Sequence, residues 1–478
     1  MQEKPARQRP LKITFMGAGS TVFVKNILGD CMCAEPLRDA EFALYDIDAS
    51  RLEQSQRMLQ ILNRNINGDR AVITVHCGKG HRRRALAGAS YVVNAIQMGG
   101  YRPSTVIDFE VPKRYGLRQT IGDTLGIGGI FRALRTIPVV LEFARDMEAV
   151  CPDAWFLNYT NPMAMVTAGL LRGSSIRGVG LCHSWHGTAW WMLHNVGLAD
   201  EHTRVDARIA GINHQAWVLS LTVDGKDMYP EFRRRASLVV EHCKRKNSRP
   251  GASYRCPNTF CRVHAACRRS PVSPFNDIVR WEFVRNFGYQ VTESSEHNAE
   301  YVPWFIKRTH PELIRQYGIP LDEYPRRCEQ QIRDWKKQYR TYVRNGTLSH
   351  ERTHEYGSYI MEALESGSPF VFGGNVMNDG LITNLPAKAC VEVACVADRT
   401  GVTPTRVGDL PEALAAINRT AINPQILTVE AALTRKREYI YQAALLDPRT
   451  AAELSVDEIR ALVDDLIEAH GSMLPVFR

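Results

Sequence analysis

The most constraining feature of this 478-residue chain is a repeated alternation of short apolar segments with longer stretches of helical spacing. It begins at residues 11–16, where an apolar run passes through Gly17-Ala18-Gly19-Ser20 into a segment with helical periodicity. Further strand-like segments follow at residues 40–48, 71–75, 91–96, 154–162 and 176–184. Strands that alternate with helices predict a parallel, doubly wound sheet, whose functional residues lie beyond the carboxyl ends of the strands.

The pattern changes near residue 205, and this change predicts the domain organisation. We expect an α/β chain with a polar tail over 1–10, a Rossmann-like doubly wound parallel sheet over 11–204, and a mixed α+β, largely helical domain over 205–478. The last domain is expected to carry catalysis and oligomerisation. The chain contains no run of eighteen apolar residues and no apolar leader, so we predict a cytoplasmic protein without a membrane partner.

The positive net charge of +9 is a local property of one segment. Eleven of the 60 Lys and Arg residues lie between positions 233 and 269, with a single acidic residue among them. The remaining charge is balanced, so no nucleic acid partner is predicted. The overlapping segment 236–276 is atypical, being basic and rich in cysteine. A basic loop, sequence from a shifted reading frame and a zinc site are the interpretations left open; the zinc ligands would be Cys256, Cys261, His264 and Cys267.

The glycine-rich turn that follows the first strand predicts a dinucleotide site. Backbone N–H groups at the start of a helix bind a pyrophosphate, and glycine lets the phosphates approach closely. Asp46, at the end of the second strand, is placed to bind a ribose 2′-hydroxyl, which favours NAD over NADP. The third glycine of the usual fingerprint is replaced by Val22, so a purely structural turn is the alternative. The predicted cofactor-binding residues of the turn are Gly17, Ala18, Gly19 and Ser20, together with Asp46.

Cys182 and His214 are candidate metal ligands. Cys182 ends a predicted strand, and a thiolate and an imidazole can share one divalent ion while leaving positions open for a substrate. Taken alone, Cys182 is also typical of a buried core thiol, and His214 of a polar residue at a strand end.

Two further segments carry polar groups suited to sugars. Asn158-Tyr159-Thr160-Asn161-Pro162 follows a strand, and its amides offer both donors and acceptors to hydroxyl groups; a simple turn is the alternative. Residues 287–305 combine aromatic side chains with Glu293, Glu296, His297 and Glu300. The alternative for this run is a solvated helix start.

Together these motifs resemble the NAD- and manganese-dependent glycoside hydrolases of family 4, and within them the α-galactosidase branch. The similar segments run from residue 11 to about 235 and resume near 280; no part of 236–276 is similar. They are KITFMGAGS, LYDID, YGLRQTIGDTLGIGGIFRALRTIP, FLNYTNPMA, GLCHS, GINHQAW and VTESSEHNAEYVPWF.

The resemblance implies a redox-neutral elimination. NAD⁺ takes a hydride from C3 of the sugar, which acidifies the C2 proton; Mn²⁺ binds the C2 and C3 oxygens; the leaving group departs from C1; water adds and the hydride returns. This family is an exception to hydrolysis by two carboxylates. The expected partner is an α-galactoside oligosaccharide such as melibiose, and a homo-oligomer is implied.

The resemblance also implies roles for individual residues. Cys182 and His214 would bind the metal, Asn161 and Asn158 the sugar, and Asn94 would line the nicotinamide side. His183 takes the place of an acidic Asp in phospho-sugar relatives, so it would act as the acid or recognise a hydroxyl. Tyr289 would be the base, with Tyr301 close behind it.

Other functions stay open at this stage. Another glycosidase of the same family, an α-glucosidase or an α-galacturonidase, would share these motifs. A nicotinamide-dependent hydroxy-acid dehydrogenase uses the same fold, but without the Cys182–His214 pair. An NAD-binding protein whose catalysis is impaired by segment 236–276 is the third alternative.

Overall fold

A computed structural model describes residues 11–248 and 277–478. Its first half contains the predicted doubly wound sheet, whose parallel strands lie in the order β3-β2-β1-β4-β5-β6. This is the strand order of a Rossmann fold, so the predicted fold class is confirmed. The strands are β1 (Lys12–Met16), β2 (Glu41–Asp46), β3 (Val72–Cys77), β4 (Tyr91–Asn94), β5 (Trp155–Asn158) and β6 (Gly178–Leu181).

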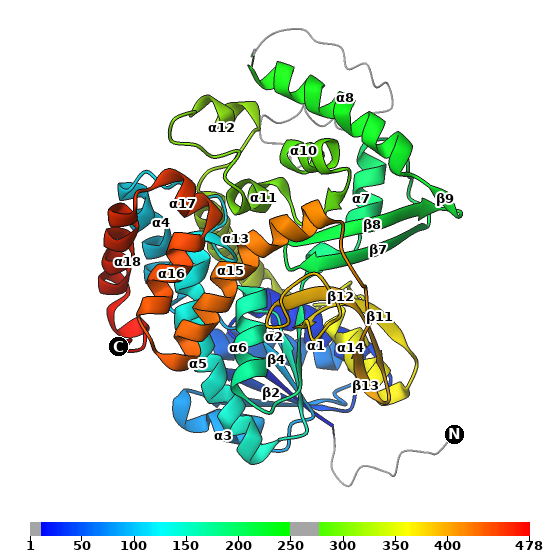
Figure 1. The fold of residues 1–478 in the computed structure, drawn as a ribbon. Helices are drawn as coiled ribbons and strands as arrows, with labels where there is room; N and C mark the ends of the chain where they lie inside the picture. The colour runs from blue at the N-terminus through cyan, green and yellow to red at the C-terminus, as the bar shows by residue number, and fades with distance from the viewer. Residues whose placement is uncertain (1–10, 249–276) are drawn as a thin grey trace.

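Helices connect these strands and cover the sheet (Figure 1). The amphipathic α2 shows how the sequence sets its ends: Asp48 accepts a hydrogen bond from the backbone N–H of Arg51, and Gly68 ends the helix with φ 60°. Helices of this half are α1 (Thr21–Cys33), α2 (Ala49–Asn67), α3 (Arg82–Leu86), α4 (Val106–Arg114), α5 (Gly126–Val150), α6 (Met163–Gly173) and α7 (Thr188–Asn195).

The second half extends the same sheet with antiparallel strands. β11 pairs with β6, and the order continues β12, β7, β8 and β10, while β13 and β9 add to β12 and β8. The described residues thus form one 13-stranded mixed sheet. The added strands are β7 (Val205–Ile212), β8 (Gln215–Val223), β9 (Lys226–Asp227), β10 (Gln290–Val291), β11 (Phe370–Met377), β12 (Cys390–Asp398) and β13 (Gly401–Pro404).

Helices make up most of the remaining C-terminal half, as predicted. Figure 1 shows α15–α18 gathered beside α4 and α5, with α8, α10 and α12 at the opposite end from α3. The helices are α8 (Tyr229–Ser248), α10 (Ile278–Phe287), α11 (Ser295–Tyr301), α12 (Glu312–Gln316), α13 (Glu323–Asn345), α14 (Gly357–Ser366), α15 (Glu412–Thr434), α16 (Glu438–Leu446), α17 (Pro448–Glu453) and α18 (Val456–His470).

Part of the atypical basic segment is ordinary helix. Ala236, Val239, Val240 and Cys243 of α8 are buried in one core cluster with Trp281 of α10. The rest of the segment, including the four proposed zinc ligands, lies outside the described residues, as does the predicted tail 1–10. None of the helices in the described part of the chain is long and apolar enough to cross a bilayer.

Candidate active site

The glycine-rich turn lies at the carboxyl edge of the sheet, between β1 and α1. The backbone N–H groups of Gly17 and Ala18 donate to Tyr45 O at 3.0 and 2.9 Å, and Gly19 N donates to Asp46 Oδ2 at 2.6 Å. Gly17 has φ +88°, and a Cβ there would lie 2.8 Å from Ala95 O. Glycine at position 17 fits this turn without strain, and the turn brings the predicted ribose ligand Asp46 beside the backbone that is predicted to bind phosphate.

Asn94 and Asn158 meet at the ends of the neighbouring strands β4 and β5. Asn94 Nδ2 donates to Asn158 Oδ1 at 2.9 Å and to Thr160 Oγ1 at 3.2 Å, and Asn158 Nδ2 donates to Thr160 O at 3.2 Å. Both asparagines are fully buried. The amide of Asn158, predicted to bind substrate, is therefore committed to neighbours within the protein. Asn94 Oδ1 is buried without a partner, which leaves an acceptor at the predicted nicotinamide side.

Cys182, His214 and Glu293 form a three-ligand cluster at this edge. Their ligating atoms all lie within 4.8 Å of one another, a spacing that suits one divalent ion. Cys182 directly follows β6, and His214 occupies the two-residue turn between β7 and β8 with φ 66°. Glu293 comes after β10, which pairs with β8 and so carries the carboxylate back to His214, where Oε2 lies 3.4 Å from Nε2.

The electrostatics of the cluster favour a bound cation. Burial lowers the pKa of His214, but its interactions with Cys182 and with the Glu293 carboxylate outweigh it and raise that pKa to about 10. Burial raises the pKa of Glu293, but His297 and His214 outweigh it and bring that pKa to about 2. The Tyr301 hydroxyl lies 2.9 Å from His214 Nδ1, so Nε2 faces the other two ligands. A thiolate, an imidazole and a carboxylate around one point fit a divalent transition metal.

Asp123 connects the metal cluster to the turn of residues 158–162, called here the sugar-motif turn because it carries the predicted sugar ligands. Its Oδ2 accepts a hydrogen bond from Asn161 Nδ2 at 3.1 Å, and its Oδ1 lies 3.9 Å from His297 Nε2. His297 Nδ1 in turn lies 3.7 Å from Glu293 Oε1. Burial opposes ionisation of Asp123, but Arg132 and the histidines keep its pKa below the usual value. The predicted substrate ligand Asn161 therefore lies beside an ionised carboxylate and is linked to Glu293 of the cluster through Asp123 and His297.

His183 directly follows the candidate metal ligand Cys182 and begins a short 3₁₀ turn, His183–Trp185. Its Nε2 is 2.7 Å from Glu355 Oε2, and its side chain is 56% exposed. Burial opposes the charged imidazolium, but the hydrogen bond and charge of Glu355 outweigh it, so the pKa of His183 is raised. The ring contacts Tyr159 and Tyr356. A protonated, accessible imidazolium at this place can donate a proton.

Tyr289, the predicted base, packs against helix α8. Its ring packs against the Tyr229 ring at 5.6 Å and beneath the Arg233 guanidinium at 5.6 Å, both on α8. Tyr301 lies four residues beyond His297 on α11, and its hydroxyl contacts His214 of the metal cluster.

Four residues of the site were missed or left without a role at the level of sequence: Glu293, His297, Asp123 and Glu392. The i, i+4 spacing of Glu293 and His297 was the available signal for these two residues. Asp123 lies within the segment YGLRQTIGDTLGIGGIFRALRTIP, one of the motifs that resemble the family. Glu392 gave no such signal, because it lies within β12. It is buried between Asn375 at 3.0 Å and Asn213 at 3.4 Å, and burial raises its pKa to about 7.

The fold and this site define an α/β enzyme that combines a dinucleotide turn with an adjacent metal cluster. Residues 12–198 match the sequence profile of the family 4 glycosyl hydrolases, and residues 209–450 match that of their C-terminal domain. The chain belongs to this family, which confirms the resemblance inferred from the motifs.

Two similar curated proteins cover nearly the whole chain. An alpha-galactosidase of Bacillus subtilis (strain 168) is 55% identical over 98% of this chain and 100% of its own length. An alpha-galactosidase of Rhizobium meliloti (strain 1021) is 32% identical over 98% of this chain and 89% of its own. A solved putative glucosidase of Bacillus subtilis shares the fold with a TM-score of 0.81 and 24% identity, covering 96% of this chain and 99% of its own.

Proposed function

We propose that this protein is an α-galactosidase that hydrolyses α-galactosides such as melibiose with the help of NAD⁺ and Mn²⁺. The observation that carries the proposal is the Cys182–His214–Glu293 cluster at the same sheet edge as the Gly17 turn. An ordinary hydroxy-acid dehydrogenase does not need such a cluster. The two similar alpha-galactosidases support galactose rather than another sugar.

The residues present fit both groups. Cys182 Sγ, His214 Nε2 and the Glu293 carboxylate would hold Mn²⁺; Gly17 to Ser20, Asp46 and Asn94 would hold NAD⁺. When bound, NAD⁺ accepts the hydride from sugar C3 and the cation stabilises negative charge on the neighbouring sugar oxygens. A solved 6-phospho-alpha-glucosidase of the same fold, 19% identical with a TM-score of 0.75, is in complex with NAD and Mn2+.

The remaining side chains supply binding and proton transfer. His183, held by Glu355, would protonate the leaving oxygen at C1. The Asn161 amide would bind a sugar hydroxyl, while Asn158 would support the same turn from inside. Two groups are candidates for the base that removes the C2 proton. Tyr289 is the one implied by the resemblance, and Asp123 is favoured by its ionised state and its place beside Asn161.

A cytoplasmic location and a homo-oligomer are further parts of the proposal. The cysteines that the structure describes are all free thiols, and a thiolate metal ligand is retained best in a reducing compartment. Light scattering coupled to gel filtration tests the oligomeric state.

The decisive experiment is hydrolysis of p-nitrophenyl α-galactoside by enzyme stripped of cofactor and metal. We expect turnover only when NAD⁺, Mn²⁺ and a thiol reductant are all restored, without net accumulation of NADH. Activity that survives stripping and chelation would disprove the mechanism. Preference for p-nitrophenyl α-galacturonide would move the protein to the galacturonidases, and net NADH formation would move it to the dehydrogenases.

A further inference from the structure

We propose that Glu300 is a positioning residue, which holds the loop 120–124 so that Asp123 keeps its place in the active site. The proposal rests on the proposed function, because it gives Asp123 a part in catalysis. Glu300 itself touches neither the metal ligands nor the sugar-motif turn. It belongs to α11, the helix that also carries His297 and Tyr301 to the metal cluster.

The Glu300 carboxylate accepts hydrogen bonds from three successive backbone N–H groups of the loop. Oε1 accepts from Gly122 N at 2.7 Å, and Oε2 accepts from Thr120 N at 2.8 Å and from Ile121 N at 3.3 Å. Glu300 is only 3% exposed, and Thr120 and Ile121 are buried as well. Buried N–H groups need a partner, so this one carboxylate determines the path of the chain up to the residue before Asp123.

A second contact from the same helix strengthens the attachment. Thr120 Oγ1 donates to the backbone carbonyl of Glu296 at 2.6 Å, one turn before Glu300. One side of α11 thus holds the loop, while His297 faces Asp123 Oδ1 at 3.9 Å. Because one short helix sets both positions, the separation of Asp123 from the metal cluster depends on the carboxylate of Glu300.

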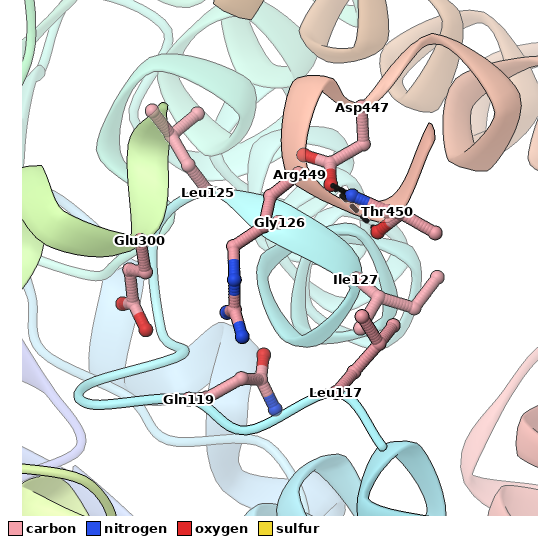
Figure 2. Close-up of a pocket in the computed structure, with 9 residues that line it drawn as sticks. All are labelled: Leu117, Gln119, Leu125, Gly126, Ile127, Glu300, Asp447, Arg449 and Thr450. Carbon is pink, nitrogen blue, oxygen red and sulfur yellow. Dashed lines mark hydrogen bonds between the residues drawn. The ribbon is translucent and has the colours of Figure 1, made fainter. Parts of the chain in front are cut away.

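The surroundings of Glu300 explain why a carboxylate is needed there. Figure 2 shows Glu300 on α11 and Arg449 on α17 around a small cavity, with Gln119 below them. Burial raises the pKa of Glu300 to about 7, while the hydrogen bonds from the loop and the positive charge of Arg449, which is also buried, favour its ionised form. Replacing Glu300 by Gln would place an amide NH₂ group opposite at least one backbone N–H in either orientation of the amide. Both groups donate, so no hydrogen bond can form there. The loop would lose at least one of its three bonds and shift.

Asp447 offers a matched control in the same cavity. It is a buried carboxylate that accepts from the backbone N–H of Thr450 at 2.9 Å and from its hydroxyl at 2.6 Å, and it lines the cavity with Glu300 (Figure 2). It caps α17 and does not bind the loop. Asp447→Asn therefore disturbs this corner of the protein without releasing Asp123.

The test compares Glu300→Gln, Asp447→Asn, Asp123→Asn and the double variant Asp123→Asn/Glu300→Gln in the enzyme loaded with NAD⁺ and Mn²⁺. We expect Glu300→Gln to lower kcat about 10- to 100-fold, as a misplaced catalytic group does, with the affinities for NAD⁺ and Mn²⁺ unchanged. Asp447→Asn should keep kcat. In the Asp123→Asn background, Glu300→Gln should cause no further loss, because the two residues act through one group.

Several outcomes would overturn the proposal. Unchanged kcat in Glu300→Gln, or an equal loss in Asp447→Asn, would show that the loop does not depend on this carboxylate. A full further loss in the double variant would show that Glu300 does not act through Asp123. If Glu300→Gln fails to fold, Glu300→Asp takes its place, because it keeps the charge on a shorter side chain. Glu300→Asp should lower kcat in an enzyme that still folds, which a cooperative melting transition would show. Full activity of Asp123→Asn would instead remove Asp123 from the proposed function itself.

Discussion

The dinucleotide turn and the metal cluster lie at the same sheet edge but are built in different ways. The turn is local: Gly17 to Ser20 are consecutive, and Asp46 is joined to them through the adjacent strand β2. The cluster takes Cys182, His214 and Glu293 from the ends of three strands that lie far apart in the chain. Damage to the first region should therefore weaken NAD⁺ binding without changing Mn²⁺ affinity, and damage to the second should impair the metal site without changing NAD⁺ affinity.

The largest effect is expected for Cys182→Ser. A serine hydroxyl stays protonated where a thiolate binds the ion, so turnover should fall by more than about 1,000-fold while NAD⁺ affinity is retained. Steady-state hydrolysis and NAD⁺ titration followed by calorimetry measure the two properties. Cys33→Ser, at an exposed thiol, is the matched control and should be silent. A Cys182→Ser enzyme with near-normal turnover would remove the cluster from the mechanism.

The variant Tyr289→Phe decides between the two candidate bases. Loss of a general base lowers kcat about 100- to 10,000-fold. A loss of that size in Tyr289→Phe would support the base implied by the resemblance, despite its packing against Tyr229. We expect Tyr301→Phe to act differently, weakening Mn²⁺ binding through His214. A change in kcat of less than about threefold in Tyr289→Phe would leave proton transfer to Asp123.

A smaller effect, confined to the cofactor region, is expected for Gly17→Ala. Alanine at φ +88° with its Cβ 2.8 Å from Ala95 O is strained, and strain of this kind costs about 1–3 kcal/mol. The strain should weaken NAD⁺ binding by about 10- to 100-fold without changing Mn²⁺ affinity. Gly80→Ala, where a Cβ meets nothing within 4 Å, is the control. Weaker Mn²⁺ binding in Gly17→Ala would mean that the two regions are not separable.

The smallest expected effect concerns stability near the cluster. Burial raises the pKa of Glu392 from 4.5 to about 7, so the folded protein binds a proton that the unfolded chain has lost in this range. The free energy of unfolding of the metal-free protein should therefore fall as the pH rises from 4.5 to about 7, by an amount on the order of 3 kcal/mol.

Glu392→Gln tests this sign directly. The variant should lose the part of the decline that Glu392 contributes and be more stable than the parent above neutral pH, as measured by urea unfolding at about pH 5 and about pH 8. Glu468→Gln, an exposed residue of α18, should leave the pH dependence unchanged. A variant with the same pH dependence as the parent would assign the decline to another group.

Motifs contained within one strand and its following turn could be predicted from the sequence. The alternation of strands and helices predicted the sheet, and Gly17, Asp46 and Cys182 each fell at a strand end as expected. Parallel strands bring their carboxyl ends to one edge, so neighbours such as Asn94 and Asn158 could also be expected to meet.

Residues supplied by the antiparallel half of the sheet were much harder to assign. Glu293 reaches His214 because β10 pairs with β8, and Glu392 reaches Asn213 because β12 pairs with β7. No periodic pattern in the sequence predicts which of these strands pair. Asn158 shows the reverse case, since a residue of the predicted sugar-binding motif is fully buried among its neighbours.

By itself the sequence determined the family, the parallel half of the sheet, and the Cys182–His214 pair at its edge, because strand ends, glycine turns and short motifs are encoded by neighbouring residues. Only the tertiary structure decided that Glu293 completes the cluster, that Asp123 faces it, and that Glu300 holds the loop between them. The contacts of the loop join residues separated by more than a hundred positions, Gly122 with Glu300 and Asp123 with His297, and they exist only once distant elements pack together and bury the polar groups that must then find partners.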